Sequence, residues 1–144
     1  MRFMVIVKAD EDSEAGKMPP ADYLAKMHEF NAELAKAGLL QAAEGLQASA
    51  KGARVHFSRG GKRTAVDGPF TETKELVAGF WIWRVKSKAE AIEWVKRIPM
   101  PSPDHEAVIE IRQVFDAEDF ESGGCMPELK EQEARLRREI EANR

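Results

Sequence analysis

The stretch from Gly79 to Val85 constrains the fold of this chain most, because it carries apolar residues on both of its alternating faces. Successive side chains of a β-strand point to opposite faces of the sheet. The two faces of this strand carry, in turn, Trp81, Trp83 and Val85, and then Phe80, Ile82 and Arg84. Both sets are mostly apolar, so we expect both faces to be covered. The sequence therefore predicts a strand whose sheet is packed on two sides.

Several other segments are expected to be strands, the first of them because it is rich in β-branched and aromatic residues. The expected strands are residues 3–8, Leu39 to Leu46, Ala53 to Ser58, Arg63 to Val66 and Ala107 to Val114. Gly60 and Gly61 lie between two of them, and two glycines between alternating segments indicate a tight hairpin.

With Gly60 and Gly61 as the hairpin turn, the register follows directly. Val55 lies opposite Val66, and Arg54 lies opposite Asp67. The expected apolar face of the hairpin consists of Val55, Phe57 and Val66, and its polar face of Arg54, His56 and Asp67.

Two helices are expected between the strands. The first begins near Pro20, because proline is favoured in the first helical turn, and it ends before Gly38. Its apolar stripe is Tyr23, Met27, Phe30, Leu34 and Ala37. Ser87 and Glu90 form a capping box that opens the second helix, which prolines 99 and 101 end.

Strands at both ends of the chain, with the two helices separated, predict an α+β two-layer domain over residues 1–114. Helices on one face of an antiparallel sheet leave the other face bare. A bare face carrying large apolar residues needs a partner, and a second copy of the chain is the simplest one. We therefore expect a homodimer.

Residues 115–144 differ in character from the rest. An acidic linker, with Gly123 and Gly124 as an expected hinge, leads to a charged helix over residues 127–142. Its narrow apolar stripe of Leu129, Leu136 and Ile140 cannot stabilise a helix alone. We expect this helix to pack on the domain or on the partner subunit.

Composition excludes several classes of protein. The formal net charge of −3 gives no reason to expect a nucleic-acid partner. The single cysteine, Cys125, rules out an internal disulfide and fits a reducing compartment. The apolar run near the N-terminus is too short for a signal peptide or a membrane span. A cytoplasmic protein is expected.

The segment Asp67-Gly68-Pro69-Phe70, followed by Thr71-Glu72-Thr73-Lys74-Glu75 and Gly79-Phe80, resembles the signature of the DGPF group of YCII-related proteins. The resemblance extends to the opening strand, His28 within Met27-His28-Glu29-Phe30, and Glu44-Gly45-Leu46. It implies a ferredoxin-like fold that dimerises into an α+β barrel. It also implies a cleft in which a histidine and an aspartate act as acid and base. A few relatives act on aromatic or chlorinated ring compounds, and some DGPF members are associated with sigma factors.

His28 and Asp67 are the candidate catalytic residues. His28 lies on the flank of the first helix, roughly 120° from the centre of its apolar stripe at about 100° per residue. A histidine there can exchange protons near neutral pH, or it can simply bind water at the rim. Asp67 either orients His28 or has a structural role in the turn. In such a turn, Asp side chains cap, Gly allows positive φ and Pro fixes φ.

The candidate ligand-binding residues lie near the turn or on the sheet: Glu44, Pro69, Phe70, Thr71, Glu72 and Arg112. The turn residues can equally cap a short helix or lie at the solvated surface. Arg112 and Glu110 share one face of the last strand, where a buried charge needs a partner, so a dimer-interface ion pair is the alternative.

No metal or cofactor is expected, because the three histidines lack ligand spacing and no phosphate-binding glycine loop is present. The leading hypothesis is a small acid/base enzyme acting on an aromatic or carbonyl-bearing molecule. The alternatives are a ligand-binding or regulatory accessory protein and a dimerisation module whose tail contacts another protein.

Overall fold

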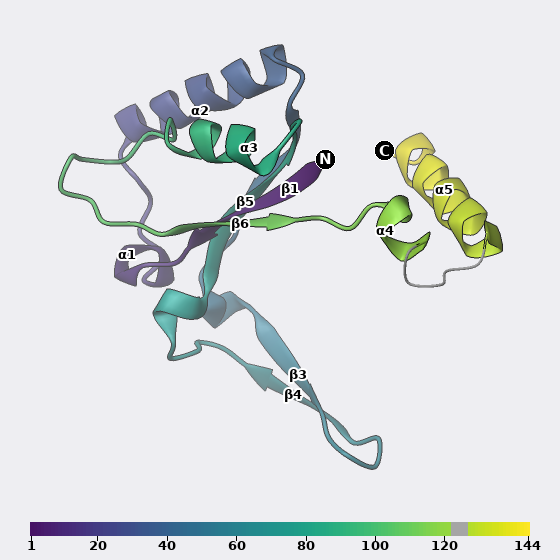
Figure 1. Ribbon diagram of the computed structural model, residues 1–144. Helices are drawn as coiled ribbons and strands as arrows, with labels where there is room; N and C mark the ends of the chain where they lie inside the picture. The colour runs from purple at the N-terminus through teal and green to yellow at the C-terminus, as the bar shows by residue number, and fades with distance from the viewer. Residues whose placement is uncertain (122–126) are drawn as a thin grey trace.

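A computed structural model describes residues 1–121 and 127–144 of the chain. Its centre is an antiparallel sheet of four strands in the order β2-β5-β1-β6, drawn in Figure 1. These strands are β1 (Arg2–Lys8), β2 (Leu40–Gly45), β5 (Val77–Arg84) and β6 (Ile109–Gln113). Helices α2 (Ala21–Lys36) and α3 (Lys88–Val95) cover one face of this sheet. The fold is therefore α+β and ferredoxin-like, as the sequence predicts.

Local signals in the sequence account for the helix ends. Pro20 occupies the N-cap position of α2, and Gly38, with φ of 76°, directly follows its C-cap residue. In α3, the hydroxyl of Ser87 accepts a hydrogen bond from the N–H of Glu90 at 3.1 Å. The Glu90 carboxylate accepts from the N–H of Lys86 at 2.7 Å, one residue before the position that a capping box predicts.

The core lies between the sheet and the two helices. Trp83 is fully buried, and the Phe30 ring lies 6.2 Å from the ring centres of both Trp81 and Trp83. Leu34 and Val5 are also fully buried in this cluster. The indole N–H of Trp81 donates a hydrogen bond to Asn31 Oδ1 at 2.7 Å. Of the two faces expected to be covered, the one with Trp81 and Trp83 forms this core, whereas Phe80 and Ile82 on the other are only half-buried.

The opposite, open face of the sheet carries a half-buried apolar strip made of Met4, Ile6, Phe80 and Ile82. Charged side chains flank the strip. Lys8 Nζ lies 3.7 Å from Glu110 Oε1, and Arg112 Nη1 lies 3.4 Å from Glu110 Oε2. Helices α2 and α3 cover only the other face, and Ile82 lines a cleft beside the C-terminal helix. Met4, Ile6 and Phe80 are the part of the strip that a further partner can cover.

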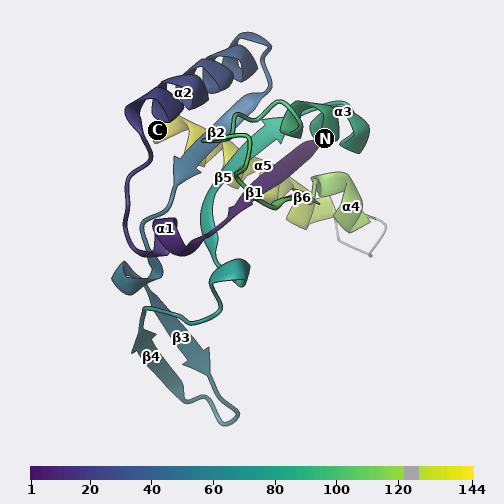
Figure 2. The same cartoon turned by 90° about the vertical axis from the view of Figure 1, so that its left-hand side faces the viewer.

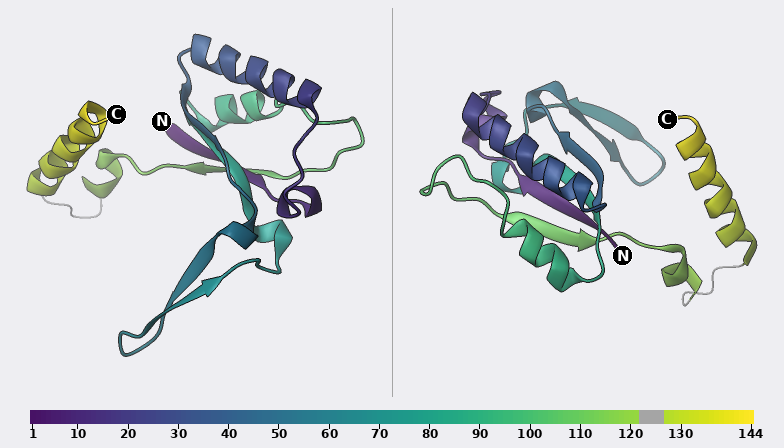
Figure 3. Two further views of the ribbon diagram at one scale, coloured as in Figure 1. Left: turned by 180° about the vertical axis from the view of Figure 1, so that it is seen from behind. Right: turned by 90° about the horizontal axis from the view of Figure 1, so that it is seen from above.

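Strands β3 (Ala53–Phe57) and β4 (Arg63–Asp67) form a separate hairpin that projects away from the sheet (Figure 3). The predicted register is wrong by one residue, because Val55 pairs with Ala65 and Phe57 with Arg63. Residues 58–62 form a longer loop, in which the N–H of Ser58 donates to the carbonyl of Lys62 at 2.8 Å. The shift places Val66 opposite Arg54 and Asp67 opposite Ala53.

Three short elements were not predicted. Helix α1 (Glu11–Glu14) lies in the acidic loop, and Asp10 and Ser13 form its capping box through hydrogen bonds of 2.8 and 2.9 Å. Two 3₁₀ turns, η1 (Ser49–Lys51) and η2 (Thr73–Glu75), flank the hairpin in sequence. η2 follows the Asp67–Phe70 turn in the chain, η1 is hydrogen-bonded to the turn, and α1 is connected to it through η1.

The C-terminal segment contains α4 (Ala117–Glu121) and the predicted helix α5 (Pro127–Ala142). Figure 2 shows α5 on the far side of the sheet from α2. No residue of α5 is buried, and Leu129, Leu136 and Ile140 are about half exposed. The expected hinge and Cys125 lie outside the described residues. None of the helices described in residues 1–121 and 127–144 is long and apolar enough to cross a membrane.

Candidate functional site

The Asp67–Phe70 turn leads from the end of β4 toward η2 and is fixed at two backbone positions. The N–H of Gly68 donates a hydrogen bond to the carbonyl of Gly52 at 3.0 Å. The N–H of Phe70 donates to the hydroxyl of Ser49, also at 3.0 Å. The peptide bond between Gly68 and Pro69 is cis. Gly68 and Phe70, on either side of Pro69, are thus hydrogen-bonded to Gly52 and to Ser49 of η1.

Ser49 connects this turn to helix α1. Its hydroxyl donates to Glu14 Oε2 at 2.5 Å, and its N–H donates to Glu14 Oε1 at 3.0 Å. One carboxylate therefore accepts two hydrogen bonds from a single residue, a strong arrangement because the acceptor is charged. The network Glu14–Ser49–Phe70 joins three segments that are far apart in the sequence.

Glycine is required at position 68 for a steric reason, and not for the positive φ that the sequence suggests. Its φ is not positive, in contrast to the loop glycines Gly60 and Gly61. A Cβ atom at position 68 would lie 1.8 Å from the carbonyl oxygen of Ser49, a distance that no side chain can adopt. The turn accepts only glycine because the backbone of η1 packs directly against it.

Asp67 itself is exposed, and its carboxylate makes no hydrogen bond or ion pair with the part of the chain that the structure describes. The cap that an aspartate commonly provides in such a turn is absent there. Near the turn, the guanidinium of Arg54 lies 3.9 Å from the centre of the Phe70 ring. This stacking covers one face of the ring and makes Phe70 half-buried.

His28 is exposed on α2, in the helix layer, whereas Asp67 lies at the base of the hairpin. The two side chains form no hydrogen bond or ion pair with each other, and within one chain they come from different parts of the fold. The structure thus brings Phe70 together with Ser49 and Arg54, but it does not pair His28 with Asp67.

The remaining predicted residues are spread over the molecule. Glu44 lies opposite Phe80 on the edge strand β2, and Arg112 lies on the other edge strand, β6. Pro69, Thr71 and Glu72 are exposed. The carbonyl of Glu72 accepts a hydrogen bond from the N–H of Glu75 at 2.9 Å, which starts η2.

A second polar cluster involves residues that the sequence did not single out as a group. His105 Nε2 lies 3.9 Å from Asp10 Oδ2. Burial raises the pKa of the Tyr23 phenol, and the negative charge of Asp10 raises it further. In the described residues, no group of three or more His, Cys, Asp and Glu side chains is placed to hold a metal ion.

Sequence reasoning missed Glu14 and Ser49 at the turn, and it placed Arg54 opposite Asp67 instead of over the Phe70 ring. Glu14 is one of several acidic residues in its loop, and Ser49 lies in a short connection without periodic pattern. Two clefts involve α5: one of about 350 Å³ against α4, and one of about 810 Å³ against the sheet. None of the predicted site residues lines either cleft.

Comparison with known proteins places these features in a family. None of the curated proteins matches the chain. The family model for the YCII-related domain matches residues 1–118, which include the whole four-stranded sheet, both covering helices, the hairpin and the anchored turn. Since this match spans most of the chain, the protein belongs to the YCII-related domain family.

Proposed function

We propose that the protein is a homodimer that binds a small aromatic or carbonyl-bearing molecule beside the Asp67–Phe70 turn. The observation that carries this proposal is the state of Asp67. Its carboxylate is exposed and makes no hydrogen bond to the described residues, although the adjacent backbone is fixed through Gly68 and Phe70. A carboxylate on a rigid support, not used by its own fold, is suited to contact a ligand.

His28 is the second group of the proposed site. Imidazole exchanges protons near neutral pH, which suits acid/base work on a carbonyl-bearing molecule. The exposed position of His28 on α2 leaves its ring accessible. Because one chain does not pair it with Asp67, this role requires that ligand binding or assembly brings the two side chains to the same molecule.

The homodimer is proposed to form through the open face of the sheet. Met4, Ile6 and Phe80 form the part of the apolar strip outside the cleft that Ile82 lines, and the pairing of β1 with β5 holds them in register. Covering such a strip removes apolar surface from water, at about 25 cal/mol per Å². Glu110, between Lys8 and Arg112, gives the strip a charged margin.

A thermal-shift screen of the full chain against small aromatic and carbonyl compounds tests the proposed site. A ligand is expected to raise the melting temperature of the wild type and to have a much smaller effect on His28→Ala. Lys26→Ala is the matched control, because Lys26 is also exposed on α2 and should respond as the wild type does. Equal shifts for wild type and His28→Ala would remove His28 from the site.

A ligand found in this way also separates the two functional alternatives. An enzyme converts the ligand, and His28→Ala then abolishes turnover even at ligand concentrations high enough to offset its weaker binding. A regulatory or accessory protein binds the ligand without converting it. Product formation measured over time with wild type and variant distinguishes these two roles.

A further inference from the structure

The larger cleft, of about 810 Å³, lies at one end of the open sheet face and is separate from the proposed site at Asp67. The starts of β1 and β2 and the end of β5 form one wall, and α5 forms the other. Ile82 and Ile140 contribute apolar surface from the two walls. The volume is within the range of small-molecule sites, and the lining combines five apolar residues with seven polar or charged ones.

The charged groups of the cleft are predominantly basic. Its lining contains four arginines, Arg2, Arg84, Arg137 and Arg144, against two carboxylates, Asp116 and Glu141. With Glu133, which pairs with Arg137, counted as well, the cleft has a formal excess of one positive charge, although the whole chain carries a net charge of −3. A local excess of positive charge in a protein of opposite sign attracts anions.

Arg2 and Arg84 are direct cross-strand partners in the pairing of β1 with β5. Like charges directly opposite each other destabilise a pair of strands. Asp116 Oδ1 lies 3.2 Å from Arg2 Nη2, but no carboxylate in residues 1–121 or 127–144 lies within ion-pair distance of Arg84. Arg84 instead donates to the amide oxygen of Gln41 at 2.9 and 3.1 Å, in the amide orientation that satisfies both groups.

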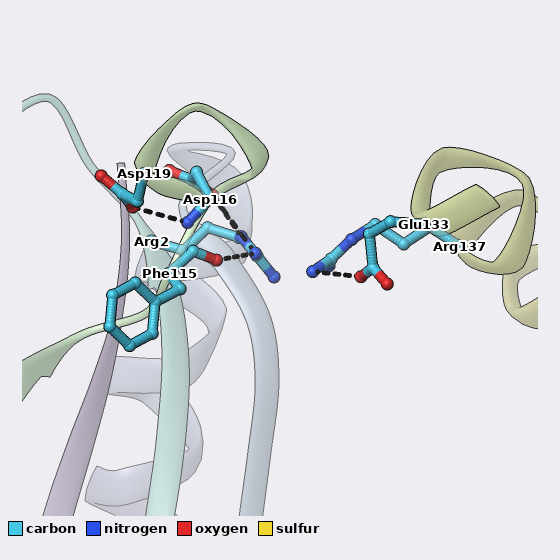
Figure 4. Close-up of polar contacts among 6 residues, drawn as sticks. All are labelled: Arg2, Phe115, Asp116, Asp119, Glu133 and Arg137. Carbon is cyan, nitrogen blue, oxygen red and sulfur yellow. Dashed lines mark hydrogen bonds and ion pairs between the residues drawn. The ribbon is translucent and has the colours of Figure 1, made fainter. Parts of the chain in front are cut away.

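A third guanidinium comes from the opposite wall. In Figure 4, the guanidinium groups of Arg2 and Arg137 point toward each other across the cleft. Each is held from behind by a carboxylate, Asp116 for Arg2 and Glu133 for Arg137, the latter at 3.0 Å. The Arg2 side chain is only 17% exposed and also donates to the carbonyl of Phe115 at 3.2 Å, so its position is fixed.

We propose that this cleft binds a small organic anion, whose carboxylate or phosphate group lies between Arg2, Arg84 and Arg137. An anion at that point would pair with Arg84, which has no carboxylate partner in the described residues, and would accept further hydrogen bonds from Arg2 and Arg137. The apolar body of the ligand packs against Ile82 and Ile140. This inference does not depend on any role of His28 or Asp67.

Calorimetric titration of the full chain with benzoate and with phenyl phosphate tests the proposal, with uncharged benzamide and inorganic phosphate for comparison. At least one of the two organic anions should bind, and the tighter one identifies the preferred headgroup. Benzamide and inorganic phosphate should bind at least tenfold more weakly. Absence of binding by both organic anions, or equal binding by benzamide or inorganic phosphate, overturns the proposal.

Arginine variants locate the binding. Arg84→Gln and Arg137→Gln should each weaken the anion at least tenfold, and both positions are exposed enough that the fold tolerates the change. Arg135→Gln is the matched control, because Arg135 forms the same i,i+4 pair on α5, with Glu131 at 4.0 Å, but does not line the cleft.

Arg135→Gln should leave the dissociation constant within twofold of the wild type. An equal loss of anion affinity in Arg135→Gln and Arg137→Gln would mean that only the overall charge matters, and it would contradict a defined site. If Arg137→Gln changes self-association of the chain and leaves anion affinity unchanged, a second copy fills the cleft and the proposal is wrong.

Discussion

The hydroxyl of Ser49 accepts a hydrogen bond from the backbone N–H of Phe70 at 3.0 Å, across 21 residues of sequence. The same hydroxyl donates to the carboxylate of Glu14. This relationship fixes the Asp67–Phe70 turn without using the Asp67 side chain. The position of the exposed carboxylate therefore depends on residues outside the signature segment.

Ser49→Ala should destabilise the protein, because it leaves the Phe70 N–H and one Glu14 oxygen without their partner. The expected loss is about 2 kcal/mol in the free energy of unfolding, as for a part-buried polar group left unpaired. Urea denaturation measures it. Ser58→Ala, at an exposed position, should change stability by less than about 0.5 kcal/mol. Equal stabilities for the two variants would mean that the network contributes nothing.

Gly68→Ala should also destabilise the protein, because its Cβ would lie 1.8 Å from the carbonyl oxygen of Ser49. Moving the backbone to relieve this overlap costs about 1–3 kcal/mol. Gly52→Ala is the natural comparison, since its Cβ would lie 3.5 Å from the same oxygen, an ordinary contact. Denaturation midpoints should fall clearly for Gly68→Ala and only slightly for Gly52→Ala; the reverse order would refute the packing argument.

Tyr23 provides a prediction about pH, and it is the single tyrosine of the chain. Burial and then the Asp10 carboxylate raise its pKa above 10.0. The folded state thus holds this proton more tightly than the unfolded state does. Its contribution to stability is complete below pH 10 and is lost as the pH rises through the folded pKa.

Phenolate absorbance near 295 nm reads the ionisation of Tyr23 directly. The midpoint for the folded protein should lie above 10, and Asp10→Asn should lower it in part, because burial remains as the larger cause. The fall in stability above pH 10 should be less steep in Tyr23→Phe than in the wild type. A folded midpoint at or below 10 would contradict this account of Tyr23.

Ile6→Glu tests the proposed dimer through the open sheet face. Ile6 lies in the apolar strip, opposite Glu110 on one side and Phe80 on the other. A glutamate there stays half in water in a single chain but would be buried unpaired in a dimer, which should shift the assembly toward monomer. Leu24→Glu, on the outer side of the helix layer, is the control. Sedimentation velocity that finds the same size for both variants would exclude this face as the interface.

Features of the fold that depend on residues close together in the sequence could be predicted. Alternation along Gly79 to Val85 predicted two apolar faces, one of which forms the core, and Pro20, Gly38 and Ser87 marked helix ends where the structure has them. The hairpin register could not be predicted, because it depends on the hydrogen bond between Ser58 and Lys62 that closes the longer loop.

The site was harder to predict because its contacts join distant segments. The residues that fix the turn, Glu14 and Ser49, are 35 residues apart and have no shared local pattern. The exposure of His28 follows from helical periodicity. The separation of His28 from Asp67 does not follow from periodicity, because it depends on the direction in which the hairpin projects from the sheet. The sequence pattern includes Gly68, but glycine is required there because the turn packs against Ser49, in a different segment of the chain.

The most direct test of the proposed function is the affinity of the best screened ligand for wild type and for Asp67→Asn, measured by calorimetry. Asp67→Asn keeps the shape of the side chain and removes its charge, and no described contact of the fold depends on that charge. If Asp67 contacts the ligand, the variant should bind about tenfold more weakly or worse, as expected for a lost charged hydrogen bond. Equal affinity, with both proteins equally stable, would contradict the claim that the anchored turn presents Asp67 to a ligand.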